Sequence, residues 1–346
     1  MSGVASPLDS ERDQNFRIIA FDGRSFVLKI SNSADDFSPI EMQTEAMLHI
    51  CRHAPELPVM QPLPTLDGTF YSATDDPHGQ HHIVRLFSFL PGRMVDSTAL
   101  KPDAIRDFGS TVAGMGIALR GFFHAAGGYK ILWDLKHTPE LRPLLETVAD
   151  PHRRAVAGRV LDRFDERVAT TLPRLRAQLI HNDLTLENIL LDDSHRVSGI
   201  VDFGDLTHTA LICDLAIALV SLMWGVPDPL GVAEIAIRGY SSVTSIEDDE
   251  ADVLADLVAA RLAALVLIAS WRVGRYPENA QYITANVELA WALLEELQSL
   301  GPTNVARRLR AACLRRGSFD VVQNRPAMDD LLERRRHVLG AALAPL

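Results

Sequence analysis

Residues 179–205 read LIHNDLTLENILLDDSHRVSGIVDFGD, and their motifs are the most informative in the sequence. It contains a His-x-Asp triplet that ends at Asp183, then Asn188, and then an Asp-Phe-Gly triplet that begins at Asp202. Two apolar runs flank the polar turn 192–196 between them, which predicts a strand–turn–strand unit. Such a hairpin would return Asp202 to the cleft that holds Asp183 and Asn188.

Phosphoryl transfer of the protein-kinase type requires these residue types in this order. One Asp accepts or orients the proton of the attacking hydroxyl, while an Asn and a second Asp hold the magnesium ions that neutralise charge between the phosphates. Either motif alone is a weak signal, because Asp-Phe-Gly can be a plain turn. Together, with Asp202 following Asp183 by 19 residues, they favour a kinase-like site over a structural coincidence.

The sequence before this stretch is typical of strands and turns. Residues 16–20 and 25–30 alternate around Asp22-Gly23, a hairpin signal, and 39–53 has helical spacing. A further strand over 82–90 stops at Pro91-Gly92. Residues 1–90 are therefore expected to form a β-rich N-terminal lobe, which the family resemblance given below implies to be the nucleotide-binding lobe.

Helical patterns dominate after residue 91. Residues 91–320 are expected to form a helical catalytic and substrate lobe, and 321–346 a C-terminal tail. The predicted fold class is α+β, a bilobal protein-kinase-like fold with a small β-rich N-lobe and a larger helical C-lobe. Its predicted helices cover 102–124, 151–172, 209–224, 232–240, 247–272, 279–298 and 305–315.

Composition excludes several classes. The 346 residues carry 34 basic and 45 acidic side chains, a net charge of −11, which argues against nucleic acid or an anionic membrane as a partner. Three scattered cysteines fit a reducing compartment. The longest apolar runs fall short of the roughly 18–20 residues of a membrane span. A cytoplasmic protein is expected.

The decisive stretch resembles the aminoglycoside phosphotransferase and choline kinase family, whose motif reads HGD, then N, then DFGD. It is most similar to hydroxylysine kinase and to the kinase modules fused to class III aminotransferases. Longer strings carry the same resemblance, and they are Asp13-Gln14-Asn15-Phe16, residues 26–32 (FVLKISN), Leu90-Pro91-Gly92-Arg93 and Tyr276-Pro277-Glu278-Asn279. Only 12 residues precede Asp13, so we expect either an N-lobe shorter than in the resembled proteins or a misplaced start of the sequence.

The resemblance implies roles one residue at a time. Asp183 matches the catalytic base or hydroxyl-orienting position, and Asn188 and Asp202 match the ligands of Mg²⁺. Lys29 matches the lysine that contacts the phosphates of ATP or GTP. Asn15 matches a polar loop that covers those phosphates.

The helical partner of Lys29 is left open between two glutamates. Glu41 and Glu45 lie four residues apart and so on one helical face. The resembled subgroup favours Glu41, whereas the wider family pattern favours Glu45, and we take Glu41 as the predicted partner.

One position departs from the family pattern. Asn182 stands where the family usually has glycine, but Asn tolerates a positive φ better than most residues. His181 beside it is interpreted as structural, because Asp183 already fills the acid–base role.

The acceptor is expected to be a small cationic molecule that bears a hydroxyl group. Candidate substrate contacts are Asp205, Tyr276 and Glu278. Trp133 and Asp134 are weaker candidates, because an aromatic side chain in a helical lobe is more often part of the core.

The C-terminal string 328–346 resembles the opening of class III aminotransferase modules, although a basic amphipathic helix would look the same. If the resemblance holds, a fused or neighbouring PLP-dependent aminotransferase or phospho-lyase is implied as partner. The expected function is phosphorylation of an amino alcohol or hydroxy amino acid of the hydroxylysine type. The alternatives are another small-molecule kinase, acting on an aminoglycoside, choline, ethanolamine or homoserine, and a catalytically weak nucleotide-binding module.

Overall fold

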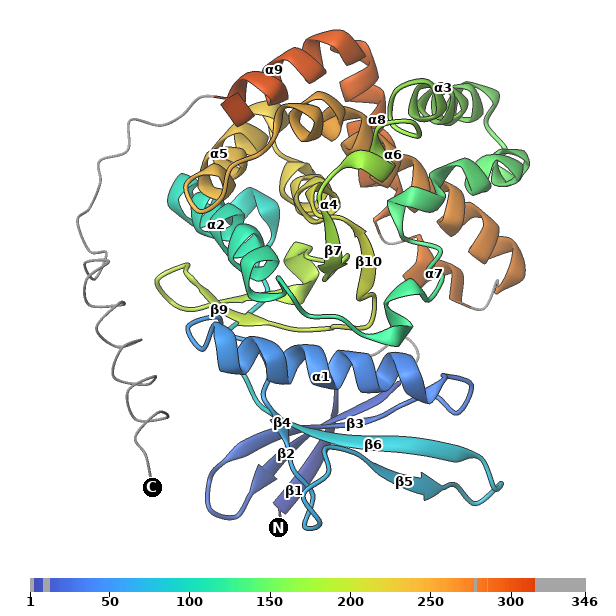
Figure 1. Ribbon diagram of the computed structural model, residues 1–346. Coiled ribbons are helices and arrows are strands. Elements are labelled where there is room, and N and C mark those ends of the chain that lie inside the picture. Colours follow the sequence, from blue (N-terminus) through green and yellow to red (C-terminus); the bar gives the residue numbers. More distant parts are fainter. Residues whose placement is uncertain (1–2, 9–12, 277–278, 285, 315–346) are drawn as a thin grey trace, which may run out of the picture. The chain divides into compact units, whose positions relative to one another are not determined.

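The computed structural model describes residues 3–8, 13–276, 279–284 and 286–314. The predicted fold class is confirmed, because a small antiparallel sheet is followed by a helical remainder (Figure 1). The part of the chain up to residue 100 contains β1 (Gly3–Leu8), β2 (Gln14–Ala20), β3 (Ser25–Ile30), α1 (Phe37–His53), β4 (Pro62–Leu63), β5 (Ser72–Asp75), β6 (His81–Ser88) and the 3₁₀ turn η1 (Ser97–Ala99).

The sheet has the order β1-β2-β3-β6-β4, with β5 paired to β6, and every pairing is antiparallel. The predicted hairpin turn at Asp22-Gly23 is present, and Gly23 has φ 86°, a backbone conformation that glycine adopts without strain. Lys29 on β3 lies opposite Asn15 on β2 and opposite Arg85 on β6. The register thus brings three polar residues of the sheet together.

Strand β1 was not expected from the sequence. Its residues are all exposed, so it lacks the alternation of buried and exposed positions that reveals a strand. It pairs with β2 along its whole length and thereby extends the sheet.

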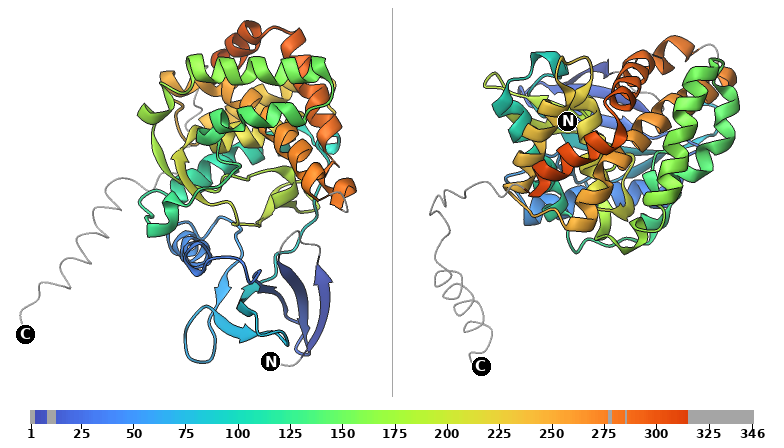
Figure 2. Two further views of the ribbon diagram at one scale, coloured as in Figure 1. Left: turned by 90° about the vertical axis from the view of Figure 1, so that its right-hand side faces the viewer. Right: turned by 90° about the horizontal axis from the view of Figure 1, so that it is seen from above.

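Helix α1 confirms the helix expected over 39–53. Of the residues whose spacing indicates its buried face, Ile40 and Met47 are buried, whereas Leu48 and Cys51 are only partly buried. In Figure 2 this helix lies between the sheet and the helical part of the molecule.

The helical part continues the chain through α2 (Pro102–Ala118), η2 (Ala125–Gly128), η3 (Leu135–Thr147), α3 (Pro151–Arg167), η4 (Leu172–Arg174), α4 (Ile212–Met223), α5 (Pro229–Ser241), α6 (Asp248–Arg275), α7 (Ala280–Ile283), α8 (Val287–Ser299) and α9 (Pro302–Leu314). Short strands interrupt it, namely β7 (Ala177–Ile180), β8 (Ile189–Leu191), β9 (Val197–Ile200) and β10 (Thr207–Ala210), with η5 (Leu186–Asn188) before β8. The helix expected over 279–298 is divided into α7 and α8.

Helix α6 is the central element of this part. It is long and apolar enough to cross a membrane, but 83% of its most apolar window is buried inside the protein. It packs against η3, α3, α4, α8 and α9. Its apolar composition is therefore that of a core helix.

The β8–β9 hairpin confirms the predicted strand–turn–strand unit and touches the N-terminal part in two places. Val59 forms a bridge with Ile200, and the backbones of Arg93 and Leu191 exchange two hydrogen bonds. Gly92, at the predicted joint, has φ 141° and passes so close to Ser198 that a Cβ would lie 2.5 Å from its Oγ. The chain at residue 92 therefore lies in direct contact with the β8–β9 hairpin.

Candidate active site

The loop between β7 and β8 brings Asp183 and Asn188 together, as the motif predicts. The Asn188 side-chain amide donates to the Asp183 carboxylate oxygen Oδ2 at 2.7 Å and to the Asp183 carbonyl at 2.9 Å. Buried Leu184 and Leu186 pin the loop between these two residues to the core. The Asp183 side chain itself is 28% exposed, so it remains open to a substrate.

The second oxygen of Asp183 is held by a residue that sequence reasoning missed. Arg261 on α6 donates from Nη2 to Asp183 Oδ1 at 2.9 Å, and its side chain is 6% exposed. Arg261 lies 78 residues after Asp183, inside an apolar helical run. The one available signal was its charge, since a buried arginine requires an acidic or polar partner.

Asp214, near the start of α4, fixes the backbone of the loop. Its carboxylate accepts from the His181 N–H at 3.2 Å and from the Asn182 N–H at 2.7 Å. Burial raises the pKa of Asp214 to about 7, although the two backbone donors act in the opposite direction. The residues just before Asp183 are thereby tied to the helical core.

Asn182 adopts the positive φ that sequence reasoning allowed for, with φ 64°. Its side-chain amide is fully buried, and neither polar atom has a hydrogen-bond partner among the described residues. Asn therefore takes the place of glycine in backbone conformation while burying an unsatisfied amide.

His181 is buried against the Phe203 ring, with ring centroids 4.7 Å apart. Its Nε2 lies 3.2 Å from the Val201 carbonyl, to which a protonated Nε2 donates. Burial lowers the pKa of His181, which keeps the ring neutral near pH 7. These contacts join the loop to the strand before Asp202, as expected of a structural histidine.

Asp202 stands immediately after the point where the hairpin meets the catalytic loop. The Val201 N–H donates to the Asn188 carbonyl at 3.0 Å, which places Asp202 beside the loop. Asp202 has φ 57°, and one carboxylate oxygen accepts from the Gly204 N–H at 3.1 Å. Asp205 is half-buried in the turn that follows.

The side chains of Asn188 and Asp202 fit a hard divalent cation. Because the Asn188 amide nitrogen is turned to Asp183, its amide oxygen is left to act as a ligand. The second carboxylate oxygen of Asp202 is a ligand of the same kind. Mg²⁺ is usually held by one or two such protein oxygens together with substrate phosphates.

Lys29 departs from its predicted pairing. Its ammonium group forms an ion pair with Asp13 Oδ2 at 2.9 Å, and the other oxygen of Asp13 accepts from the Asn32 N–H. Glu41 and Glu45 instead lie 3.6 and 3.9 Å from Nε2 of His124. The pair expected between Lys29 and Glu41 is therefore not formed.

Arg85, opposite Lys29 in the sheet, is the cation that contacts helix α1. It is 2% exposed, and its guanidinium donates to the Ile40 carbonyl, to Thr44 Oγ1 and to Gln43 Oε1. Burial lowers the pKa of Arg85 to about 10. Through these contacts Arg85 attaches strand β6 to helix α1.

Asn15 lies inside β2 rather than in a loop before it, which corrects the predicted boundary. It faces Lys29 in the strand register, and its side-chain oxygen is buried without a hydrogen-bond partner among the described residues. Its position next to Lys29 keeps it near the predicted phosphate site.

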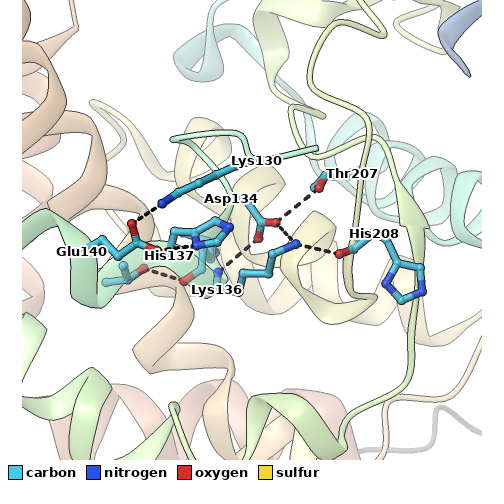
Figure 3. Close-up of polar contacts among 9 residues, drawn as sticks. Lys130, Asp134, Lys136, His137, Glu140, Thr207 and His208 are labelled. Carbon is cyan, nitrogen blue, oxygen red and sulfur yellow. Dashed lines mark hydrogen bonds and ion pairs between the residues drawn. The ribbon is translucent and has the colours of Figure 1, made fainter. Parts of the chain in front are cut away.

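The weaker substrate candidates have structural contacts. Asp134 is buried, caps η3 through the Lys136 N–H, and forms an ion pair with the Lys136 ammonium at 2.7 Å (Figure 3). Lys136 in turn donates to the His208 carbonyl, and Thr207 lies 3.4 Å from Asp134. The Arg261 guanidinium lies over the Trp133 ring, with its Cζ 5.2 Å from the ring centroid.

Tyr276 is 42% exposed at the end of α6, where it is available to a ligand. Glu278 lies outside the described residues, and so do residues 315–346, which include the aminotransferase-like string.

A small antiparallel sheet that carries Lys29, followed by a helical part that carries Asp183, Asn188 and Asp202, is the arrangement of a small-molecule kinase with a protein-kinase-like fold. The family model of the phosphotransferase enzyme family matches residues 4–257. The chain belongs to that family.

Curated relatives and solved structures agree with this assignment. The chain is 31% identical to hydroxylysine kinase of Danio rerio, over 89% of this chain and 90% of that protein. It is 28% identical to hydroxylysine kinase of Mus musculus, over 85% and 84%.

Two solved structures share the fold. A microcompartment-associated aminopropanol kinase matches with TM-score 0.68 and 21% identity, over 88% of this chain and 94% of that one. Amicoumacin kinase hAmiN, in complex with AMP-PNP and Ca²⁺, matches with TM-score 0.63 and 16% identity, over 82% and 87%.

Proposed function

We propose that the protein transfers the γ-phosphoryl group of ATP or GTP to the hydroxyl of a small amino alcohol or hydroxy amino acid, with 5-hydroxylysine as the leading acceptor. The observation that carries this proposal is the Asp183 carboxylate, partly exposed and held at both oxygens. The identity to hydroxylysine kinases over most of the chain supports the choice of acceptor.

In the proposed reaction, Asp183 accepts the hydrogen bond of the acceptor hydroxyl and orients its oxygen toward the γ-phosphorus. The new oxygen–phosphorus bond forms as the bond to the bridging oxygen of the nucleoside diphosphate breaks, and the hydroxyl proton passes to Asp183. Mg²⁺ held by Asn188 and Asp202 would neutralise the phosphates. Lys29 and Asn15 would contact the phosphates from the sheet. Most of the catalysis is then positioning and electrostatics.

The acceptor would bring a cationic amine into the site. Asp205 is proposed to attract this charge, and the exposed ring of Tyr276 to present its face to it. Glu278 belongs to the same proposal. The product would be a phosphate ester of an amino alcohol, whose phosphate is a good leaving group for elimination.

That chemistry points to a PLP-dependent aminotransferase or phospho-lyase as the consumer of the product, either fused to this chain or encoded nearby. A cytoplasmic location is part of the same proposal. Its support is the free thiol state of Cys51, Cys213 and Cys313.

Coupled release of ADP or GDP over a panel of acceptors tests the function. The panel contains 5-hydroxylysine, 1-amino-2-propanol, ethanolamine, choline, homoserine and an aminoglycoside, with lysine as the matched control that lacks the hydroxyl. We expect 5-hydroxylysine to have the highest kcat/KM and to give a product heavier by one phosphoryl group, and lysine to give none. A higher kcat/KM for another acceptor would move the protein to another substrate within the family. Nucleotide binding without turnover on any acceptor would indicate a binding module.

A further inference from the structure

Arg261 is a charged residue in the middle of the long core helix α6. Its residue exposure is 5%, and its neighbours Ala260, Leu262 and Ala263 are fully buried. Placing a cation there is costly, and an apolar side chain of similar volume would usually serve a core helix as well. Stability alone therefore does not account for an arginine at this position.

The contacts of Arg261 point instead to the catalytic loop. Its Nη2 donates to Asp183 Oδ1, whereas its Nη1 is buried without a hydrogen-bond partner among the described residues. The guanidinium plane rests over the Trp133 ring. The arginine is thus packed on one side against Trp133 and donates its hydrogen bond to the carboxylate of Asp183.

Both oxygens of Asp183 are consequently fixed, and by different elements. Oδ1 is held by Arg261 from the core helix α6, and Oδ2 by Asn188 from η5. A carboxylate oxygen has about two acceptor sites, so each oxygen retains one for an incoming hydroxyl. The two donors leave Asp183 a single orientation without occupying all of its acceptor capacity.

We propose that Arg261 is a positioning residue for phosphoryl transfer. Through Asp183 it fixes the plane of the carboxylate that orients the acceptor hydroxyl, and it anchors that plane to the rigid core helix. Trp133 supports this by holding the guanidinium. The inference rests on the proposed role of Asp183 and adds that this role depends on a residue 78 positions away.

The effect of Arg261 should therefore appear in kcat rather than in nucleotide binding. Loss of a charge-assisted hydrogen bond corresponds to about a 10- to 100-fold fall in kcat. In Arg261→Met we expect this fall, with an unchanged Kd for ATP by calorimetry. Arg261→Lys, which retains the charge but not the planar fork, should recover part of kcat.

Arg163→Met is a matched control, because Arg163 is an arginine of α3 that pairs with a carboxylate of the helix that carries Arg261. Arg163 forms an ion pair with Asp256 of α6, and Arg167 also holds Asp256, so the pair is only partly lost. This variant should lower the melting temperature without changing kcat per folded molecule. If Arg261→Met does not fold, Arg261→Lys is measured in its place, with a fall in kcat at unchanged Kd expected.

The decisive comparison is Asp183→Asn against the double variant Asp183→Asn with Arg261→Met, using the acceptor that the wild type phosphorylates fastest. If Arg261 acts through Asp183, the double variant is no slower than Asp183→Asn alone. A further fall equal to that of Arg261→Met would overturn the proposal, as would unchanged kcat in Arg261→Met. Wild-type turnover in Asp183→Asn would instead overturn the assigned role of Asp183, and with it both proposals.

Discussion

At the scale of single residues, partners that are distant in sequence set the geometry of each charged group. Lys29 is held by Asp13, and Asp183 is held by Arg261. In both pairs the side chains are mostly shielded from water, so the charges interact more strongly than they would on the surface. The orientation of each functional side chain is therefore fixed before any ligand binds.

The Lys29 pairing leads to a prediction that separates Asp13 from Glu41. Replacing Asp13 by Asn removes the charge that orients the lysine, so KM for ATP should rise about tenfold, the equivalent of about 1.5 kcal/mol. Glu41→Gln is the matched control, because Glu41 faces His124 and should leave KM for ATP nearly unchanged. Steady-state kinetics at saturating acceptor gives both values. A KM for ATP that rises in Glu41→Gln but not in Asp13→Asn would instead make Glu41 the partner of Lys29.

The sequence could predict those site contacts that are local. Asp183 and Asn188 are five residues apart on one loop, and the motif already implies their proximity. Asn182 was expected to tolerate a positive φ, and it does. Arg261 could not be placed, because its contact depends on how α6 packs across the core.

At the scale of elements, the catalytic loop and helix α1 are both attached to their surroundings by buried polar groups. Asp214 of α4 holds the loop through two backbone N–H groups, and Arg85 of β6 holds α1 through Ile40 and Thr44. Both attachments join residues that are more than 30 positions apart in the sequence. Each therefore depends on correct packing of two elements.

The raised pKa of Asp214 predicts how stability varies with pH. Its pKa of about 7 in the folded protein lies above the ordinary value of 3.8, so the folded state binds this proton more tightly than the unfolded chain. The resulting stabilisation is fully present below pH 3.8 and is lost as the pH rises through 7. When the pH is lowered from 8 to 5, the free energy of unfolding of the wild type should therefore rise by about 2 to 3 kcal/mol relative to that of Asp214→Asn.

Urea unfolding of the two proteins at several pH values measures this difference. Asp193→Asn, an exposed substitution in the β8–β9 turn, serves as the control and should follow the wild type. A free-energy difference between wild type and Asp214→Asn that does not change with pH would show that the buried carboxyl does not titrate in this range.

At the scale of the whole molecule, hydrophobic periodicity predicted most of the architecture. The hairpin at Gly23, helix α1 and the β8–β9 unit all follow from local patterns. Strand β1 did not, because an exposed edge strand carries no buried face. The division of the helix expected over 279–298 also escaped prediction, because periodicity locates helical segments better than it locates breaks between them.

The proposed phosphoryl transfer uses residues from both the N-terminal sheet and the helical part. The sheet carries Lys29, the helical part carries Asp183, and the β8–β9 hairpin that precedes Asp202 contacts the N-terminal part through Val59 and Arg93. A kinase of this design should bind nucleotide without the catalytic carboxylate but should not transfer the phosphoryl group.

Turnover and nucleotide affinity of Asp183→Asn, measured on the same preparation, test this claim most directly. We predict that kcat with 5-hydroxylysine falls by about 10² to 10⁴, the usual contribution of a positioned base. The Kd for ATP from calorimetry should stay at the wild-type value, and Asp193→Asn should match the wild type in both quantities. Turnover by Asp183→Asn at the wild-type rate would contradict the account.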